Sequence, residues 1–339
     1  QADESLLAEV LTKKFADHLP LYRQAEILMR DGIQISRQTL CQWTLRCGEA
    51  LKPLMLYMLD KILKSKNVFI DEIPVKMLSP GKGKTLQGYM WIVAGGCSSD
   101  PPYRVYEFYT NRQHRNVAAI LKDYQGIVHS DKYGAYFDLA LAKQFDWCPC
   151  WVHVRRKFFE AEAGDKEFRI WILERIGLLF SIEEDAWLCS PEERLKIRKE
   201  QEEPLIDEII AAVKKRMVEG AILLPKSKFK EALGYFMSLI PYLKTYINYP
   251  FARLDNNVAE RALRPLAIGR KNWLFFGNEG GGQAAAVIFS LIQTCRGLGI
   301  NPREYLEDVM RRIMSHPAKS LEELLPDHWL AAKVATPPS

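Results

Sequence analysis

The sequence contains no apolar segment long enough to cross a membrane. Its longest window without a charged residue, 280–295, holds 16 residues and begins with three glycines, whereas a spanning helix needs about 20 apolar residues. We therefore expect no membrane association. Internal repeats and low-complexity tracts are also absent, and 48% of the residues are hydrophobic. Collagen-like and disordered classes are excluded, and 339 residues suffice for two or three globular domains.

The cysteines lack the pattern of a disulfide framework. There are seven, an odd number, without repeated spacing, so reduced thiols and a cytoplasmic protein are the simplest interpretation. The chain begins Gln-Ala-Asp-Glu, without an initiator methionine or a signal-peptide pattern. We expect it to be a fragment whose upstream part is missing.

The net charge of +5 is too small to indicate a nucleic-acid partner by itself, but the charge is distributed unevenly. The segment 160–220 contains 16 acidic and 10 basic residues, so the rest of the chain is distinctly basic. This distribution is compatible with a polyanion partner and also with an ordinary solvated helix. We expect the acidic segment to be a scaffold or a protein–protein surface, with Glu202, Glu203 and Asp207 exposed on it.

The first 63 residues show helical patterns. A helical stretch at 21–29 is followed by a turn at Asp31-Gly32, and Ser36 is a suitable N-cap for a helix that runs through Arg46. This is helix-turn-helix spacing, although a packing subdomain gives the same pattern. In the DNA-binding interpretation the second helix offers four polar side chains to DNA: Arg37, Gln38, Gln42 and Arg46.

Strand patterns follow the helical region and alternate with helices. Apolar and β-branched runs predict strands at 67–71, 87–97, 103–109, 126–131 and 145–151. Helices are predicted between them at 111–124 and 133–143, which indicates a mixed α/β sheet. Strand signals are then absent from 152 to 249, where charged amphipathic helices are expected. In the last part of the chain, the sequence predicts a helix at 254–265 that ends at a proline. A strand-like stretch at 273–276, a glycine turn at 280–282 and two further helices are expected after it.

Three carboxylates stand where a metal site is commonly built. Asp71 and Asp131 end predicted strands, at the edge of an open sheet where sites form. Glu260 lies on a helix, in one stripe with Asn256 and Arg264. Gathered carboxylates repel one another unless a cation neutralises them, and oxygen ligands suit Mg²⁺ or Mn²⁺. Two such ions about 3.5–4 Å apart promote phosphodiester displacement. Either Asp taken alone is also explained as an N-cap or a turn residue.

Basic residues adjoin Glu260 in the sequence. A grip on a phosphate backbone requires such residues, and a solvated face with pairs such as Glu260–Arg264 is the alternative. The cluster consists of Arg261, Arg264, Arg270 and Lys271.

A second cluster of potential metal ligands and basic residues occupies 147–157. Cys148, Cys150 and His153 raise the possibility of zinc, but their spacing is unusual and a fourth ligand is not obvious. We favour the interpretation that both cysteines lie on a strand, whose side chains point alternately to its two faces. His153 then begins the next helix, on which Arg155 and Arg156 are available to phosphate.

Several motifs in this chain resemble those of transposases of the insertion-sequence-66 family. The resemblance extends from Leu6 to Trp329. The motifs occupy 71–76 (DEIPVK), 80–84 (PGKGK), 88–91 (GYMW), 130–136 (SDKYGAY), 150–158 (CWVHVRRKF), 254–265 (LDNNVAERALRP), 269–275 (GRKNWLF), 316–318 (HPA) and 324–329 (LLPDHW).

The resemblance implies a ribonuclease H-like core with an Asp-Asp-Glu triad that holds two Mg²⁺ or Mn²⁺ ions. Its positions in this chain are Asp71, Asp131 and Glu260, separated by 60 and 129 residues. The second gap is long because the helical block is inserted before the last ligand. Members of the family usually carry an upstream coiled coil and zinc-binding region, which this chain lacks, and Lys132 stands where a small residue is expected.

The predicted fold class is therefore α/β, a ribonuclease H-like mixed sheet with flanking helices and a large helical insertion. We expect a helical N-terminal region at 1–63, core segments at 64–160 and 251–295, the insertion at 161–250 and a C-terminal helical element at 296–339. The implied function is that of a nucleoid-associated DNA transposase that acts on element ends and target duplexes as a homo-oligomer. A transposase-derived protein that only binds DNA, and a nuclease that cuts without joining, are the alternatives.

Overall fold

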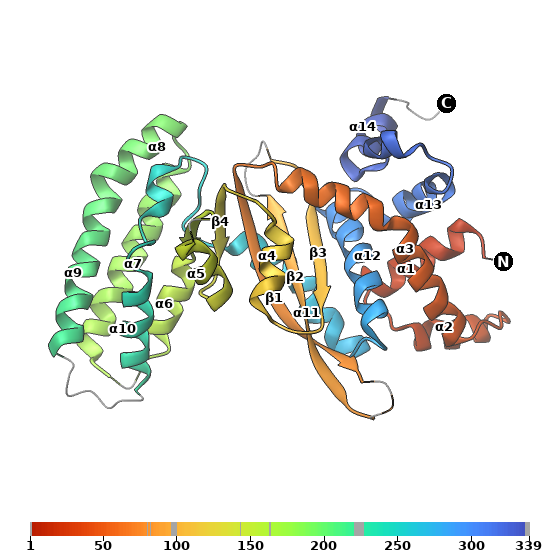
Figure 1. The fold of residues 1–339 in the computed structure, drawn as a ribbon, viewed down its shortest axis with the longest axis horizontal. Helices are drawn as coiled ribbons and strands as arrows, with labels where there is room; N and C mark the ends of the chain where they lie inside the picture. Colours follow the sequence, from red (N-terminus) through yellow and green to blue (C-terminus); the bar gives the residue numbers. More distant parts are fainter. Residues whose placement is uncertain are drawn as a thin grey trace. The chain divides into compact units, whose positions relative to one another are not determined.

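A computed structural model of the chain describes residues 2–79, 81, 83–95, 100–142, 144–162, 164–219 and 227–335 (Figure 1). The chain forms two compact units. The first comprises Gln1–Lys122 and Val258–Ser339, and the second comprises Asp123–Asn257. The second unit is therefore continuous in sequence, whereas the first is built from both ends of the chain.

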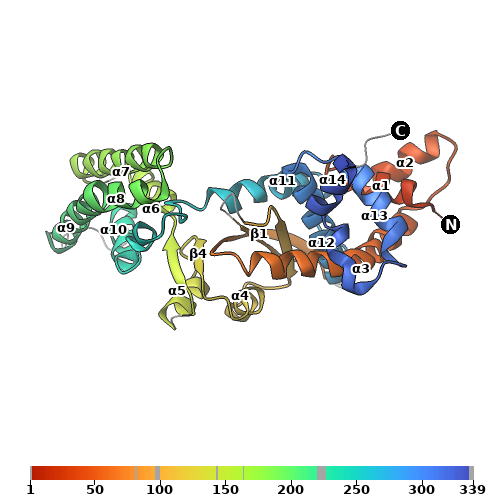
Figure 2. The ribbon, with the colours of Figure 1, turned by 90° about the horizontal axis from the view of Figure 1, so that it is seen from above.

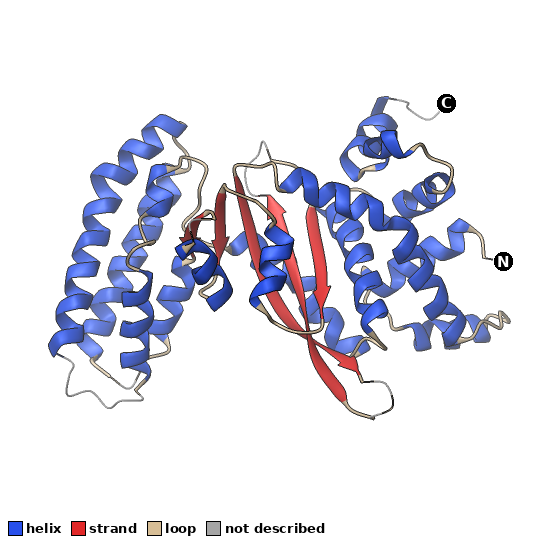
Figure 3. Cartoon of the chain, in the orientation of Figure 1, coloured by secondary structure: helices blue, strands red, loops and turns tan. Residues whose placement is uncertain are grey.

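The first unit contains three antiparallel strands in the order β3-β2-β1 (Figure 3). They are β1 (Asn67–Leu78), β2 (Thr85–Gly95) and β3 (Arg104–Tyr109). These strands confirm the strand and hairpin predicted between 67 and 109. β1 is longer than predicted, because Ile73, Val75 and Met77 continue its pairing with β2 well beyond Asp71.

Helix α12 (Glu279–Gly297) covers the outer edge of β3. The backbone N–H groups of Arg104 and Tyr106 donate to the hydroxyl oxygens of Thr294 (3.0 Å) and Ser290 (2.8 Å). These two hydroxyls are four residues apart and share one helix face. They satisfy donors that an edge strand otherwise leaves unpaired, so α12 completes the sheet on this side.

The predicted glycine turn at 280–282 is wrong. Gly280 to Gly282 form the first turn of α12, and the side chain of Asn278 caps it by accepting the N–H of Gly281 (2.8 Å). Small residues also bring α12 close to α3 (Arg37–Ile62). A Cβ atom on Gly48 of α3 would lie 2.6 Å from the Cβ atom of Ala284, so these helices pack almost backbone to backbone.

The remaining helices of the first unit surround the sheet and α12. In Figure 2, α11 and α4 lie on opposite faces of the sheet. These helices are α1 (Glu4–Phe15), α2 (Leu21–Arg30), α4 (His114–Leu121), α11 (Asn257–Trp273), α13 (Pro302–Ile313), η4 (Ala318–Leu324) and α14 (Pro326–Ala335).

The second unit begins with two parallel strands and continues as a helical block. The strands are β4 (Ile127–Ser130) and β5 (Asp146–Pro149), joined through α5 (Gly134–Leu141). Trp151, predicted as strand, begins the next helix. The helical part comprises α6 (Trp151–Phe159), α7 (Lys166–Ala186), α8 (Pro191–Ile197), η1 (Arg198–Glu202), α9 (Glu203–Glu219), α10 (Lys228–Leu239) and η3 (Thr245–Asn248).

The core of the helical block is organised around the guanidinium group of Arg198, which is fully buried. Its Nε and Nη2 atoms donate to the carboxylate of Glu183. The remaining donors bind the carbonyl oxygens of Tyr246 (3.0 Å), Tyr249 (2.7 Å) and Ala252 (2.9 Å). All five N–H donors of the side chain are thus used, and Arg198 fixes the segment that leads toward α11.

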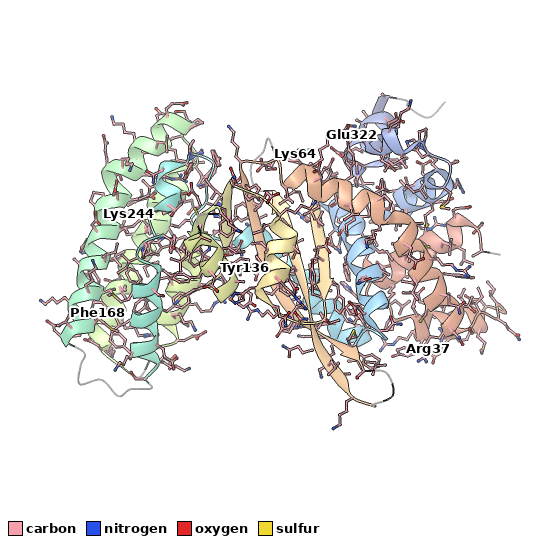
Figure 4. The ribbon with its side chains drawn as sticks, viewed as in Figure 1. Arg37, Lys64, Tyr136, Phe168, Lys244 and Glu322 are labelled. Carbon is pink, nitrogen blue, oxygen red and sulfur yellow. The ribbon has the colours of Figure 1, made fainter. Side chains whose placement is uncertain are left out.

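The acidic surface expected on this block is only partly present. Glu202 is buried and accepts a hydrogen bond from the hydroxyl of Tyr246 (2.6 Å), so its predicted exposure is wrong. Glu203 and Asp207 form ion pairs with Lys244, which is labelled in Figure 4 (3.3 and 2.7 Å). Part of the excess negative charge is therefore neutralised within the block.

The predicted mixed α/β class with flanking helices is confirmed. Residues 152–249 contain only helices and turns in the part of that range that the structure describes. Among all described residues, no helix combines the length and the apolar character that a membrane span requires.

Candidate active site

Asp71 lies within β1 and does not end it. It is the fifth of the twelve residues of the strand, so the prediction that a strand ends at Asp71 is wrong. In the sheet Asp71 pairs with Ile92, and Ile92 pairs with Tyr106. Directly opposed residues of antiparallel strands project from the same face. Asp71, Ile92 and Tyr106 therefore form one row on one face of the sheet.

The same face is covered by α11, the helix that carries Glu260. The hydroxyl of Tyr106 donates to the carbonyl oxygen of Ala262, at 2.5 Å. The side chain of Arg270 donates to the carbonyl oxygen of Pro74, at 2.6 Å. The first bond connects the N-terminal half of α11 to β3, and the second connects its C-terminal half to β1.

The height of Glu260 along β1 follows from these contacts. Phe276 bridges Met77 in the parallel sense, so the chain after α11 runs in the same direction as β1. Arg270, which contacts Pro74, lies ten residues after Glu260, or about 15 Å of helix. Asp71 precedes Pro74 by about 10 Å of strand. Tyr106 stands in the row of Asp71 and contacts Ala262, two residues after Glu260. Glu260 therefore lies near the height of Asp71 along the strand, and Asp71 projects toward the side where α11 runs.

Helix α11 continues through Pro265 to Trp273, so the predicted end at the proline and the predicted strand at 273–276 are wrong. The reason is the apolar face beyond the proline. Leu266, Gly269 and Trp273 are all buried, and their packing outweighs the hydrogen bond that Pro265 cannot donate. Glu260 is partly buried in the first turn of the helix.

Asp131 directly follows β4, as predicted, and belongs to the second unit. One of its carboxylate oxygens accepts the backbone N–H of Tyr133 at 3.0 Å, so Asp131 also caps the turn that leads into α5. The structure thus brings Asp71 and Glu260 into one unit and places Asp131 in the other.

Two lysines and Tyr235 gather beside Asp131, and sequence reasoning missed this group. The ammonium groups of Lys132 and Lys157 lie 5.1 and 5.6 Å from the ring centroid of Tyr235. Partial burial and the charge of Lys157 lower the pKa of Lys132, and burial with the charge of Asp131 raises the pKa of Tyr235. Tyr235 lies about a hundred residues from Asp131 in the sequence, so no local pattern could have revealed it.

The two cysteines of the second cluster are buried. Burial raises the pKa of the Cys148 thiol well above its ordinary range. Cys150 precedes α6, outside the strand in which we predicted it, and its sulfur accepts the backbone N–H of Asn256 (3.3 Å). Among the described residues, Cys150 and His153 offer metal-binding atoms within 4.8 Å of each other, whereas Cys148 is not part of that group. The zinc alternative therefore stays a prediction, without Cys148 as a ligand.

The predicted DNA-contacting residues lie on three helices, and most are exposed. Arg270 is partly covered by its contact with β1. The exposed residues are Arg37 and Gln42 on α3, Arg155 and Arg156 on α6, and Arg261, Arg264 and Lys271 on α11.

The helical hairpin predicted near the N-terminus is present as α2 and α3. The side-chain oxygen of Ser36 accepts the N–H of Thr39 at 3.1 Å, so Ser36 caps α3 as predicted. Leu21 and Leu40 from the two helices join Val10 of α1 in one apolar cluster. Arg37, labelled in Figure 4, lies in the first turn of α3, which extends well beyond Arg46 to Ile62.

Comparison with known proteins identifies the relatives of the chain. Residues 1–284 match the family described as "Transposase IS66 family", and residues 290–326 match the "IS66 C-terminal element". Together these two matches cover most of the sequence, including every residue discussed above in β1, β4 and α11.

Three curated relatives come from Sinorhizobium fredii (strain NBRC 101917 / NGR234). "Uncharacterized protein y4qI" is 34% identical over 340 residues, which cover 95% of this chain and 62% of the relative. "Uncharacterized protein y4hP" is 32% identical over 98% of this chain and 63% of its own length. "Uncharacterized protein y4jD" is 31% identical over 98% and 67%, respectively. The chain therefore spans roughly three-fifths to two-thirds of the length of these relatives.

Proposed function

Since the chain belongs to the IS66 transposase family, we propose that it is a DNA transposase with a ribonuclease H-like core, whose metal-binding carboxylates are Asp71, Asp131 and Glu260. In this proposal it cuts the ends of a mobile element and joins the freed 3′-hydroxyl groups to target DNA. The work takes place on DNA in the nucleoid, with a homo-oligomer assembled on the two ends.

The observation that carries the proposal is the relation between Asp71 and Glu260 within the first unit. Asp71 projects toward the face of the sheet along which α11 runs, and Glu260 lies on α11 at a similar height. Two carboxylates on facing elements supply the oxygen ligands that hard cations prefer. The family resemblance adds Asp131, which follows a short strand and stands beside Lys132 and Lys157.

The donor set fits Mg²⁺ or Mn²⁺, because all three proposed ligands offer carboxylate oxygens. A divalent cation bound there would lower the pKa of a water molecule and neutralise charge on the phosphate being attacked. The task of the protein is to hold the three carboxylates in place and to keep them ionised. Asp131 also accepts the N–H of Tyr133, which restricts the orientation of its carboxylate.

Basic side chains position the DNA strand in this proposal. Arg261 and Arg264 are exposed on α11 within one helical turn of Glu260, and guanidinium groups bind phosphate oxygens in pairs of hydrogen bonds. Lys132 and Lys157 supply positive charge beside Asp131. Phosphate contacts of this kind orient the duplex without reading its sequence.

An assay with labelled element ends and a target plasmid separates the proposal from its alternatives. The purified chain, supplied with Mg²⁺ or Mn²⁺, should give labelled DNA joined to the plasmid. Cut but unjoined ends would indicate a nuclease, and bound but uncut ends would indicate a DNA-binding protein. Either of the last two results would overturn the proposal of a complete transposase activity for this chain.

A further inference from the structure

Two stretches of this chain contain basic residues and no acidic ones. Residues 73–99 hold three lysines and residues 261–278 hold four basic side chains, whereas the whole chain has 42 acidic residues. The first stretch follows Asp71 and Glu72 in β1, and the second follows Glu260 in α11. Each acid-free stretch therefore begins where the carboxylates of the candidate site end.

The two stretches are joined in space. The backbone N–H of Phe276 donates to the carbonyl oxygen of Lys76, and the N–H of Leu78 donates to that of Phe276, both at 2.9 Å. The hydrogen bond from Arg270 to Pro74 lies next to them. The distal part of the β1–β2 ribbon and the end of α11 consequently lie side by side.

The ribbon extends beyond the third strand of the sheet. β1 and β2 pair from Val68–Gly95 to Leu78–Thr85, but β3 pairs with β2 only between Tyr89 and Ala94. The paired residues 75–78 and 85–88 thus form a two-stranded ribbon that projects past β3, as Figure 1 shows. Lys76 and Lys84 are exposed on it.

Three large apolar side chains are exposed in the same region. Leu86 projects from the ribbon face opposite to that of Lys76, because Leu86 pairs with Met77. Leu86 is 52% exposed, Leu274 is 60% exposed and Phe275 is 39% exposed. Leu86 pairs with Met77, and Met77 bridges Phe276, so the three side chains belong to one neighbourhood. The stacked rings of Trp273 and Phe276, with centroids 4.6 Å apart, support the turn between them.

The direction of Leu274 is fixed by its backbone. Its φ angle is +66°, a left-handed conformation that a leucine rarely adopts. Trp273 and Phe276 on either side of it are buried, so the turn is held by its neighbours while Leu274 and Phe275 are directed outward.

We propose that both faces of this ribbon and the adjoining end of α11 bind distorted duplex DNA. The residues are Lys76, Lys84, Leu86, Lys271, Leu274 and Phe275, called here the ribbon surface. The inference rests on the proposed function, because it adds a second DNA contact to the same protein. Charge complementarity selects the partner: basic side chains without any neighbouring carboxylate in sequence favour a polyanion. A two-stranded ribbon fits a DNA groove, and apolar side chains inserted at a base step kink the duplex.

The lysines and the apolar residues have separate tasks in this proposal. Lys76 and Lys84 neutralise phosphates and so contribute to every duplex equally. Leu274 and Phe275 contact unstacked bases and so contribute most where stacking is already weakened. The ribbon surface should therefore prefer a duplex with a central mismatch over a perfect duplex of the same length.

The first arm of the test measures the affinity of the purified chain for fluorescent duplexes in EDTA, across a range of salt concentrations. Lys76→Ala/Lys84→Ala should weaken binding to perfect and mismatched duplexes by the same factor. It should also reduce the slope of log K against log salt by about 2. The matched control is Lys214→Ala/Lys215→Ala, which removes two exposed lysines from the acidic helical block and should leave both quantities nearly unchanged.

The second arm compares the two duplexes directly. Leu274→Gly/Phe275→Ala should abolish the several-fold preference for the mismatched duplex and leave the salt slope unchanged. Glycine accepts the left-handed backbone at 274 without strain, so this variant should fold, as thermal unfolding will verify. Leu188→Ala is the matched control, because Leu188 is a highly exposed leucine outside the ribbon surface.

The outcomes separate this inference from the proposed function. Unchanged affinity and salt slope in the lysine variant, or an unchanged mismatch preference in the apolar variant, would overturn the ribbon surface even if the protein cuts and joins DNA. Loss of both properties in the variants, but not in the controls, would support the ribbon surface even if the purified chain does not cut.

Discussion

The hydroxyl of Tyr106 donates a hydrogen bond to the backbone carbonyl oxygen of Ala262, with 2.5 Å between the two oxygens. Tyr106 stands in the row of the sheet that contains Asp71, and Ala262 lies two residues after Glu260. This bond connects the strand that carries one proposed ligand to the helix that carries another. Burial raises the pKa of Tyr106 far above its usual range, so the hydroxyl keeps its proton at any pH of interest.

Tyr106→Phe should therefore loosen α11 without removing any proposed ligand. The loss of one buried hydrogen bond costs about 1 kcal/mol of unfolding free energy, which leaves the protein folded. We expect the Mg²⁺ concentration for half-maximal cleavage to rise several-fold while DNA affinity stays constant. Tyr57→Phe removes a hydroxyl that donates to Glu322 in η4, and neither α3 nor η4 carries a proposed ligand; it should not change the Mg²⁺ dependence.

Arg198 should be the most sensitive position of the helical block. Arg198→Lys keeps the charge but cannot reproduce five donors in a planar fork, so Glu183 and three carbonyl oxygens lose partners. Breaking a buried pair costs about 3–5 kcal/mol, which urea unfolding will measure. Arg216→Lys keeps a charge beside Glu219 and Asp165, with which the half-buried Arg216 forms ion pairs, and should cost at most about 1 kcal/mol. Equal losses in the two variants would refute the central role of Arg198.

Glu202 should make stability depend on pH. Burial, followed by the nearby charge of Glu183, raises the pKa of Glu202 from 4.5 to about 8. A raised carboxyl pKa means that the folded state retains a proton which the unfolded chain releases, so this stabilisation is complete below about pH 4.5 and is lost as the pH rises to about 8. The free energy of unfolding should fall through this range by up to about 1 kcal/mol per pH unit.

Glu202→Gln isolates this effect. The buried imidazole of His129 has the opposite effect on stability at lower pH. Burial and the charge of Arg253 lower the pKa of His129 to about 3. The stabilisation that the neutral imidazole provides is therefore lost as the pH falls below about 6.5. The clean window is therefore pH 6.5–8, where His129 is neutral. Thermal unfolding of Glu202→Gln should show a flatter pH dependence there than the parent, and an identical slope would contradict the assignment.

The close contact between α3 and α12 gives a prediction about packing. A methyl group at Gly48 would lie 2.6 Å from the Cβ atom of Ala284, so Gly48→Ala forces the helices apart and should cost about 1–3 kcal/mol. Gly177 in α7 has nothing within 4 Å of such a methyl group, and Gly177→Ala should stabilise the protein by about 0.5–1 kcal/mol. Denaturation of both variants checks the difference in sign.

Local patterns in the sequence predicted the elements whose causes are local. Alternating apolar residues predicted the strands, and the side chain of Ser36 caps α3 where expected. Pro265 misled the prediction, because the burial of Leu266 and Trp273 that sustains α11 depends on packing far along the chain. The same holds for Asp71, whose strand continues because β2 pairs with it.

The contacts that organise the two units join residues distant in sequence. Tyr106 and Ala262 are separated by 156 residues, and Arg198 binds the carbonyl of Ala252 across 54 residues. Neither partner carries a local signal, because a backbone carbonyl is present at every residue. The carboxylates could be proposed from the sequence because of family motifs, whereas the bonds that hold their elements required the structure.

The most direct test of the central claim is metal-dependent cleavage of a labelled element end by three single variants: Asp71→Asn, Asp131→Asn and Glu260→Gln. Each should lose cleavage with both Mg²⁺ and Mn²⁺ while it binds the same DNA at least as tightly as the parent, because a negative charge has been removed. Asp123→Asn and Glu279→Gln, at exposed carboxylates, should cut normally. Cleavage retained by any of the three proposed ligand variants would contradict the account.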